Sequence, residues 1–238
     1  MRTKLQHFKD NADSDLVIES GKQLYYEVSG HWHEVFGNKN PIVLELGCGR
    51  GAYTIALAQQ HPEWNVIGVD IKGDRLWYGA QKAKEFELKN VCFLRARIEQ
   101  IEEFFSPGEV HEIWITFPDP HPKKRSINRR MTNARFLRRY ADILKDGGLV
   151  HVKTDSQDFH LFTKHEVHMS DHFKIIIAMT DIADLPSTHI LQSIQTQYES
   201  RYRLEGRQIT YIQLQRMGVV FRILNCIPII GRLTKRGR

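Results

Sequence analysis

Short apolar runs alternate with longer, helix-like segments along the chain from residue 41 onward. The first apolar run, at 42–46, ends in a glycine-rich turn, and the segment after it has the composition of a helix. Short apolar strands that alternate with longer helices predict a parallel sheet with helices on both faces. The runs predicted as strands are 42–46, 66–69, 91–94, 112–116 and 149–153, and the predicted helices between them are 52–60, 74–88 and 133–144.

Two more β-rich runs, 173–179 and 208–214, follow a helix predicted at 159–168. The long link between these runs suits a final pair of strands, at least one of them antiparallel, at the edge of the sheet. We therefore expect a Rossmann-like α/β fold with a seven-stranded, mostly parallel sheet.

The chain is predicted to have three parts. Residues 1–40 are polar, with a helix expected at 24–36, and should form an N-terminal arm packed on the core. Residues 41–214 form the predicted catalytic domain. Residues 215–238 are a basic and apolar extension, which would either pack on the core or bind a partner or a membrane surface.

Composition favours a cytoplasmic protein. The 238 residues are 41% hydrophobic, enough for one well-buried core. The sequence has no apolar run of about 18 residues, as a transmembrane helix would need, and no apolar stretch near Met1 like that of a signal peptide. The three cysteines are far apart and form neither a disulfide framework nor a zinc-ligand spacing, so we expect no metal.

The net charge of +6 favours a polyanionic partner without establishing one, but the distribution of the charge is more informative. A basic cluster lies in the middle of the chain, and a smaller one ends it. The members of the first cluster are Lys123, Lys124, Arg125, Arg129, Arg130, Arg135, Arg138 and Arg139. Such a cluster is either a solvated surface or a nucleic-acid contact.

A glycine turn follows the first apolar run, in the sequence ELGCGRG at 45–51. Gly47 and Gly49 let the backbone approach a ligand, and Asp70 has the spacing of a carboxylate that accepts hydrogen bonds from ribose hydroxyls. Glu45 would repel a pyrophosphate but can neutralise an ammonium group, such as that of S-adenosylmethionine. A tight turn without a ligand is the alternative. The KDGG turn at 145–148, before the fifth run, supports the methyltransferase interpretation.

A proline-rich loop, FPDPHPKKR at 117–125, follows the fourth run. Its prolines exclude a helix or a central strand and predict an ordered loop at the carboxyl end of a strand, where ligands bind in open α/β sheets. We therefore expect Asp119 to lie near the methyl donor and the cations after it to point outwards. A purely structural turn capped by Asp119 is the alternative.

Four motifs together resemble the tRNA (guanine-N7-)-methyltransferase family of class I methyltransferases. They are ELGCGRG at 45–51, FPDPHPKKR at 117–125, KTD at 153–155 and TQYE at 196–199, the last followed by Arg201, Tyr202 and Gly206. The resemblance spans roughly residues 42–214. Its FPDP and TxYE motifs are specific, whereas the glycine turn alone is not.

The resemblance implies a role for each matched position. Asp119 is expected to be catalytic or to position the substrate. The cofactor would contact Glu45, Gly47, Gly49, Asp70, Arg97 and Asp119. The substrate would contact Lys123, Asp155, Thr196 and Glu199, of which Asp155 and the Thr196/Glu199 pair would bind the target guanine. The RNA would contact Lys124, Arg125, Arg129 and Arg130.

Three positions depart from the family pattern. Asp70 stands where the family usually has Glu, and His121 where it usually has Trp. Arg97 lies near the position of an Asp that accepts from the adenine amino group, although an arginine side chain has no acceptor. Either the backbone of Arg97 contacts the adenine, or Glu99 supplies the acceptor, or the cofactor binds less tightly.

The resulting prediction is an enzyme that methylates guanine N7 at position 46 in the variable loop of tRNA, with S-adenosylmethionine as methyl donor. Its partner would be tRNA and not a membrane, and the sequence does not fix its oligomeric state. One alternative is a methyltransferase of another RNA or of a small molecule. A second is a non-catalytic RNA-binding protein on a decayed methyltransferase fold, which Arg97 favours and intact Glu45, Asp70 and Asp119 oppose.

Overall fold

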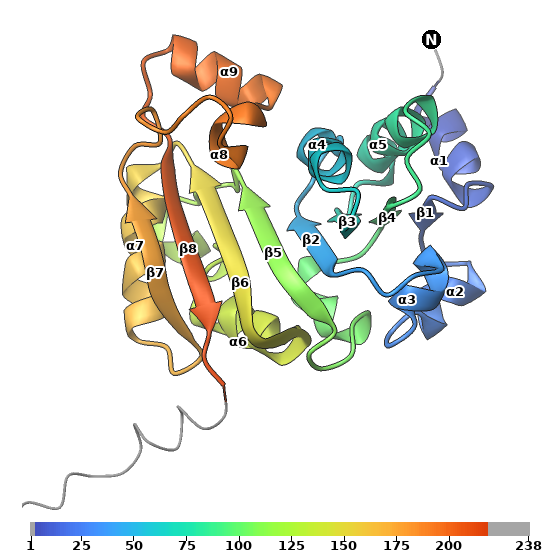
Figure 1. Cartoon of the computed structure of the whole chain (residues 1–238), viewed down its shortest axis with the longest axis horizontal. Coiled ribbons are helices and arrows are strands. Elements are labelled where there is room, and N and C mark those ends of the chain that lie inside the picture. Colours follow the sequence, from blue (N-terminus) through green and yellow to red (C-terminus); the bar gives the residue numbers. More distant parts are fainter. Residues whose placement is uncertain (1–2, 219–238) are drawn as a thin grey trace, which may run out of the picture.

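A computed structural model describes residues 3–218, which fold around one eight-stranded sheet (Figure 1). The strand order is β1-β4-β3-β2-β5-β6-β8-β7. The strands are β1 (Val17–Ile18), β2 (Ile42–Leu46), β3 (Asn65–Val69), β4 (Val91–Leu94), β5 (Val110–Thr116), β6 (Leu144–Thr154), β7 (Phe173–Met179) and β8 (Thr210–Arg216). The first six strands are parallel, and β8 is antiparallel to both β6 and β7. The predicted mostly parallel α/β fold is confirmed.

The sheet has one strand more than the seven predicted. The two residues of β1 pair in register with β4, Val17 with Phe93 and Ile18 with Leu94. A strand of two residues is too short to show a hydrophobic period, so no sequence pattern marks it. The extra strand extends the β4 edge and leaves the order of the other seven unchanged.

Helices cover both faces of the sheet, as the sequence predicts. Helices α6 and α7 contribute to one apolar core, and α4 and α5 to a second core on the opposite face. The helices are α1 (Lys4–Ala12), α2 (Gln23–Glu27), α3 (Trp32–Phe36), α4 (Ala52–Gln60), α5 (Gly73–Glu85), η1 (Ile98–Glu103), η2 (Lys124–Arg129), α6 (Ala134–Ile143), α7 (Gln157–His168), α8 (Ile190–Ser193) and α9 (Gln197–Leu204). None of them in residues 3–218 is long and apolar enough to span a membrane.

Helices α4 and α5 approach the sheet closely because glycines face Phe93 of β4. A Cβ on Gly51, before α4, would lie 2.6 Å from the Phe93 ring. A Cβ on Gly79, within α5, would lie 2.5 Å from the same ring, and one on Gly68 of β3 would lie 2.8 Å from it. The aromatic ring therefore fills a slot that only glycine leaves open on three sides.

The helix predicted at 24–36 is two short helices, α2 and α3. Gly30 lies between them with a φ of +84°, and a Cβ there would lie 2.9 Å from Ser106 Oγ. A left-handed residue cannot continue a right-handed helix, so the chain turns at this point.

The N-terminal residues pack beside α5. Trp77 Nε1 donates to Asp10 over 2.8 Å, and the His7 ring stacks on the Trp77 ring at 4.0 Å. Asn11 Nδ2 donates to the carbonyl of Gly73 over 2.7 Å. These contacts hold α1 against the first half of α5, which follows the turn that contains Asp70.

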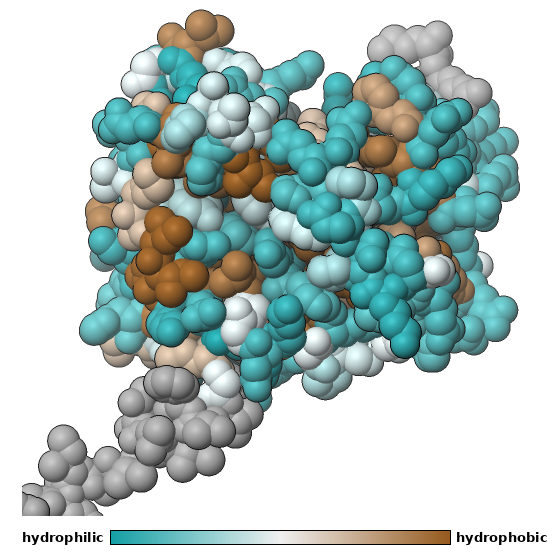
Figure 2. Space-filling view, in the orientation of Figure 1, coloured by the Kyte–Doolittle hydropathy of each residue, from teal (hydrophilic) through white to brown (hydrophobic). Residues whose placement is uncertain are grey.

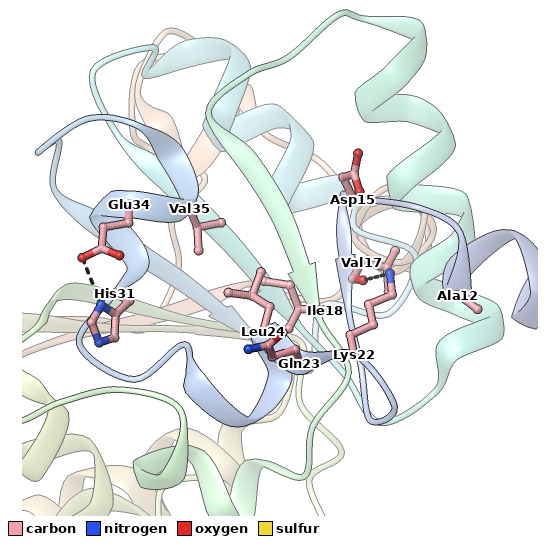
Figure 3. A pocket seen from close by; sticks show the side chains of 10 residues that line it. All are labelled: Ala12, Asp15, Val17, Ile18, Lys22, Gln23, Leu24, His31, Glu34 and Val35. Atoms are coloured by element: carbon pink, nitrogen blue, oxygen red, sulfur yellow. Dashed lines mark hydrogen bonds and ion pairs between the residues drawn. The ribbon is translucent and has the colours of Figure 1, made fainter.

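A pocket lies within the N-terminal region, and every residue that lines it belongs to 12–35 (Figure 3). Lys22 is one of these residues, and its Nζ donates to the carbonyls of Asn11, Ser14 and Val17 over 2.6–2.8 Å. Three carbonyls already engage the ammonium group, so it ties the loop before β1 together. The pocket includes none of the predicted site residues.

The last described residues follow β8. Arg216 pairs with Asp146 over 2.7 Å, and residues 219–238, which make up most of the predicted C-terminal extension, lie outside the described residues. Next to β8, the edge strand β7 exposes Ile176 and Ile177 by 44% and 43%, at a register shift, and apolar surface is visible there (Figure 2).

Candidate active site at the carboxyl edge of the sheet

The predicted site residues converge on the edge of the sheet where the parallel strands end, at the top of Figure 1. The glycine turn follows β2, Asp70 follows β3, Arg97 lies beyond β4, the proline-rich loop follows β5 and Asp155 follows β6. Parallel strands place all these segments at one edge.

The glycine turn is held against the end of β3. The N–H groups of Gly47 and Cys48 both donate to the carbonyl of Val69, over 2.8 and 3.0 Å. Gly49 has a φ of +56°, and a Cβ on it would meet no atom within 4 Å. The turn therefore leaves open space above Gly49, where a ligand can approach the backbone.

Asp70 joins two turns. Its Oδ2 accepts from the Gly49 N–H over 3.0 Å, and its Oδ1 accepts from the Lys72 N–H over 2.8 Å. The sequence spacing correctly predicts that Asp70 meets the glycine turn. Each carboxylate oxygen has more than one lone pair, so both can still accept from a ligand hydroxyl.

Glu45 is a buried carboxylate beneath the glycine turn, with 2% of its surface exposed. Two hydroxyls donate to it, that of Thr54 from α4 and that of Thr116 from the end of β5, the latter over 2.7 Å. Burial raises the pKa of Glu45 to about 7, although both threonine hydrogen bonds act to lower it. A positively charged ligand at this position would stabilise the ionised form.

The proline-rich loop contains two residues with a strained backbone, one at its start and one at a turn within it. Phe117 and His121 are left-handed, with φ of +48° and +42°, a conformation that costs roughly 1–3 kcal/mol in a residue with a Cβ. The Phe117 N–H donates to the carbonyl of Lys153 over 2.8 Å, and Asp119 Oδ1 accepts from the His121 N–H over 3.0 Å. The side chain of Asp119 is nevertheless 71% exposed. The loop therefore presents this carboxylate outwards.

The cations after the loop separate into an exposed group and one buried residue. Lys123, Lys124, Arg125 and Arg129 are exposed on and next to η2. Arg130 is 8% exposed; its Nε donates to the carbonyl of His121 over 3.3 Å, and its guanidinium lies 4.5 Å from the Phe162 ring centroid. Arg130 thus contacts the loop from the protein side, which sets it apart from the other predicted RNA contacts.

The acids predicted to bind the target base are engaged within the protein. Asp155 Oδ2 pairs with Arg207 over 2.8 Å. Glu199 has no exposed surface and pairs with Lys153 over 2.7 Å and with Arg203 over 2.8 Å. Thr196 caps α9, because its hydroxyl accepts from the Glu199 N–H over 3.2 Å. These residues lie close to the loop, since the rings of Phe117 and Tyr202 of α9 are 6.1 Å apart.

Arg97 and Glu99 are both exposed beyond β4. The carbonyl of Arg97 accepts from the Gln100 N–H over 2.9 Å. This bond uses one of the two lone pairs of the Arg97 carbonyl, so the backbone can still accept from the adenine amino group. The side chain of Glu99, in the first turn of η1, is the exposed carboxylate nearest to it in sequence.

Several residues of the site were not assigned a role by the sequence. They are Thr54 and Thr116, which bond to Glu45, and Lys153, Arg203 and Arg207, which pair with the acids near α9. Thr116 immediately precedes the proline-rich loop, and Lys153 belongs to the KTD motif. Their positions in the sequence could therefore have indicated that both belong to the site. No group of three or more potential metal-ligating side chains occurs within residues 3–218.

The fold is that of a methyltransferase. The 16S rRNA methyltransferase KamB superposes with a TM-score of 0.61 and 14% identity, over 79% of this chain and 94% of that one. A 16S rRNA (adenine(1408)-N(1))-methyltransferase from Catenulisporales acidiphilia gives a TM-score of 0.57 and 18% identity, over 80% and 93%. At such low identity these likenesses define the fold alone.

Sequence relatives define the family. A family model described as "Putative methyltransferase" matches residues 39–212. The tRNA (guanine-N(7)-)-methyltransferase of Christiangramia forsetii is 44% identical over 90% of this chain and 98% of its own length. The enzyme of the same name from Bacteroides thetaiotaomicron is 41% identical over 90% and 86%. The chain belongs to the tRNA (guanine-N(7)-)-methyltransferase family, as the four motifs predicted.

Proposed function

We propose that this protein transfers a methyl group from S-adenosylmethionine to N7 of a guanine in tRNA, at position 46 of the variable loop. The observation that carries the proposal is the common edge shared by the glycine turn, buried Glu45 and the loop of Asp119. The glycine turn and Glu45 suit a methyl donor. The exposed cations that come after Asp119 in the chain suit an RNA backbone. A tRNA substrate supports a cytoplasmic location.

The residues at the glycine turn fit S-adenosylmethionine. Glu45 would face the ammonium group of its amino-acid end, Gly47 and Gly49 would let the backbone approach, and Asp70 would accept from the ribose hydroxyls. The space over Gly49 leaves room for a ligand, and a bound ammonium group would offset the burial that raises the pKa of Glu45. The bound donor supplies an electrophilic methyl group on a sulfonium.

Guanine N7 carries a lone pair and no proton, so its methylation depends on alignment more than on a strong base. A carboxylate can hold the base by accepting from its N1–H and N2–H₂ groups and can offset the positive charge that develops on the ring. Asp119 suits this role because its side chain is exposed, in a loop at the same edge of the sheet as the glycine turn. Lys123 would contact the substrate next to it.

Asp155, Thr196 and Glu199 complete the predicted guanine site. Asp155 would contact the base only by sharing or exchanging its bond with Arg207, whose side chain is 49% exposed. Glu199 would first have to give up internal bonds, whereas the Thr196 hydroxyl can cap α9 and still donate its own O–H. Asp119 is therefore the carboxylate that is best placed to reach an incoming base.

The direct test is incubation with labelled S-adenosylmethionine and unmodified tRNA, followed by nucleoside analysis. We expect label in 7-methylguanosine, and its loss from a tRNA in which guanine 46 is replaced. Label in a different nucleoside would refute the proposed specificity. Absence of S-adenosylmethionine binding at millimolar concentration would instead identify a decayed methyltransferase fold.

Neutralising the exposed basic group with Lys123→Gln, Lys124→Gln, Arg125→Gln and Arg129→Gln should weaken tRNA binding. Each phosphate contact releases counterions, so four lost contacts should reduce the slope of log K against log salt by about 3. Filter binding across salt concentrations measures this slope. The matched control neutralises Lys39, Lys84, Lys89 and Lys145, which are exposed near the amino ends of the strands. Equal slopes for the two variants would exclude the η2 surface.

Arg97→Asp should tighten S-adenosylmethionine binding several-fold. The change introduces an acceptor for the adenine amino group where the arginine has none. Calorimetric titration of the variant measures the Kd, and Glu99→Ala, which removes the acceptor, is the companion variant. If Glu99 already supplies the acceptor, Glu99→Ala should weaken binding and Arg97→Asp should leave it unchanged.

A further inference from the structure

Lys153 is a fully buried lysine in the middle of the sheet. It has no exposed surface and pairs with Thr116 of β5 on one side and Tyr211 of β8 on the other. Burial lowers the pKa of Lys153 from its usual value, while Glu199 acts to raise it. A charged group in such a position must have its hydrogen bonds satisfied.

The ammonium group of Lys153 bonds to one segment only. It donates to the carbonyl of Leu191 over 2.6 Å and to the carbonyl of Ile194 over 3.2 Å, and it forms an ion pair with Glu199 Oε2 at 2.7 Å. Two hydrogen bonds and one buried ion pair thus join this ammonium group to residues 191–199. Lys153 therefore anchors α8, the start of α9 and the turn between them to β6.

The backbone of the same residue holds the proline-rich loop. The carbonyl of Lys153 accepts from the N–H of left-handed Phe117 over 2.8 Å. The Lys153 ammonium also lies 6.0 Å from the Phe117 ring centroid. Phe117 is two residues from Asp119, so one residue connects the catalytic loop with the segment that carries the TQYE motif.

Stability alone is a weak reason for such an ion pair, because well-packed apolar residues often stabilise a core as well or better. The contacts of Lys153 instead fix a position: two hydrogen bonds and one buried ion pair hold α8 and the start of α9 in one placement relative to the loop. We propose that Lys153 is a positioning residue for methyl transfer, which holds the segment 190–199 against the loop of Asp119.

If Lys153 positions this segment, which rests on the proposed function, Glu199 is a partner of Lys153 and not a residue that binds the guanine. Its carboxylate bonds to Lys153 and Arg203 and has no exposed surface. Glu199 then acts by fixing α9, and the bases of the tRNA contact other groups. Tyr198, which is 62% exposed on the same helix, is thereby held on the outer side of the site.

The test separates position from stability. Lys153→Met alone leaves Glu199 buried with one partner fewer, so the variant to study is Lys153→Met with Glu199→Gln, which removes both charges at similar volume. We expect a lower melting temperature, because the carbonyls of Leu191 and Ile194 lose their donor, but an unchanged Kd for S-adenosylmethionine and an unchanged KM for tRNA at a temperature where the variant is folded. The kcat should fall about 100-fold, as expected for a misplaced reacting group.

Hydrogen exchange gives a readout that does not depend on activity. Amides of 190–204 should exchange faster in the double variant, while those of α6 should not change. Val152→Ala, on the same strand and also buried, is the matched control for general destabilisation and should retain the wild-type kcat. A double variant with wild-type kcat, or with unchanged exchange in 190–204, overturns the proposal.

Glu199→Gln alone provides the second variant if the double variant does not fold. Positioning predicts a partial loss of kcat, about tenfold, together with faster exchange in 190–204. Loss of kcat without any change in exchange would mean that Glu199 contacts the base directly, and the proposal would be wrong. If the wild type transfers no methyl group to tRNA, the proposed function fails, and the exchange data alone still decide whether Lys153 anchors the segment.

Discussion

Asp119→Ala should lower the kcat of tRNA methylation about 100-fold, the size of effect expected when a reacting base loses its alignment. The fold should be unaffected because the side chain is 71% exposed and accepts one hydrogen bond, from the His121 N–H. Steady-state kinetics with S-adenosylmethionine and tRNA give the kcat, and thermal unfolding gives the stability. Near-normal turnover would refute the proposed role.

Asp119→Asn is the control that separates charge from loop geometry. The asparagine oxygen can still accept from His121, so the turn is preserved, but the negative charge is lost. If the carboxylate offsets charge on the methylated ring, Asp119→Asn should be nearly as inactive as Asp119→Ala. An active Asp119→Asn with an inactive Asp119→Ala would show that the residue serves only to shape the loop.

S-adenosylmethionine should bind more tightly as the pH rises through the pKa of Glu45. With a pKa of about 7 in the ligand-free protein, the carboxylate is mostly protonated at pH 6 and mostly ionised at pH 7.5. The ammonium group favours the ionised form, so the contribution of Glu45 should strengthen binding about eightfold over this interval. Because the amino group of the ligand titrates near pH 8, the readout is the ratio of the Kd of Glu45→Gln to that of the wild type.

Glu45→Gln itself should weaken binding about 30-fold at pH 7.5, as expected for the loss of one charge-assisted hydrogen bond. The ligand-free variant should also be more stable than the wild type at pH 8. The raised pKa means that folding favours the protonated carboxyl, so the wild type loses stability as the pH rises from about 4.5 to about 7. A Kd ratio that does not change with pH would show that Glu45 does not face the ammonium group.

The sequence predicts the parts of this protein that depend on local pattern. The strands and α-helices between 42 and 179 follow from apolar runs and glycines, but the sequence does not predict η1 and η2, and the expected KDGG turn at 145–148 lies within β6. The convergence of Glu45, Asp70 and Asp119 on one edge follows from parallel strand order. It does not predict β1, which is too short for a pattern, or α8 and α9, which lie in a polar stretch without helical periodicity.

The internal partners of the predicted acids depend on tertiary structure. Glu199 and Lys153 are 46 positions apart, and Asp155 and Arg207 are 52 apart, so no local pattern connects either pair. The resemblance at the TQYE motif implies a role for Glu199, but it does not indicate whether Glu199 binds a base or another side chain. That distinction needs the structure, which shows the side chain buried between Lys153 and Arg203.

The slot around Phe93 divides the glycine motif into two kinds of glycine. A Cβ on Gly49 would meet no atom within 4 Å and one on Gly47 would meet Met131 at an ordinary 3.8 Å, whereas a Cβ on Gly51 would lie 2.6 Å from the Phe93 ring. A larger residue at position 51 would fit only if Phe93 were replaced by a smaller residue. The same holds for a larger residue at position 79 or 68, because each would also meet the Phe93 ring. Gly51 is therefore needed because the helix after it lies so close to the sheet. Only Gly47 and Gly49 affect which ligand can approach the turn.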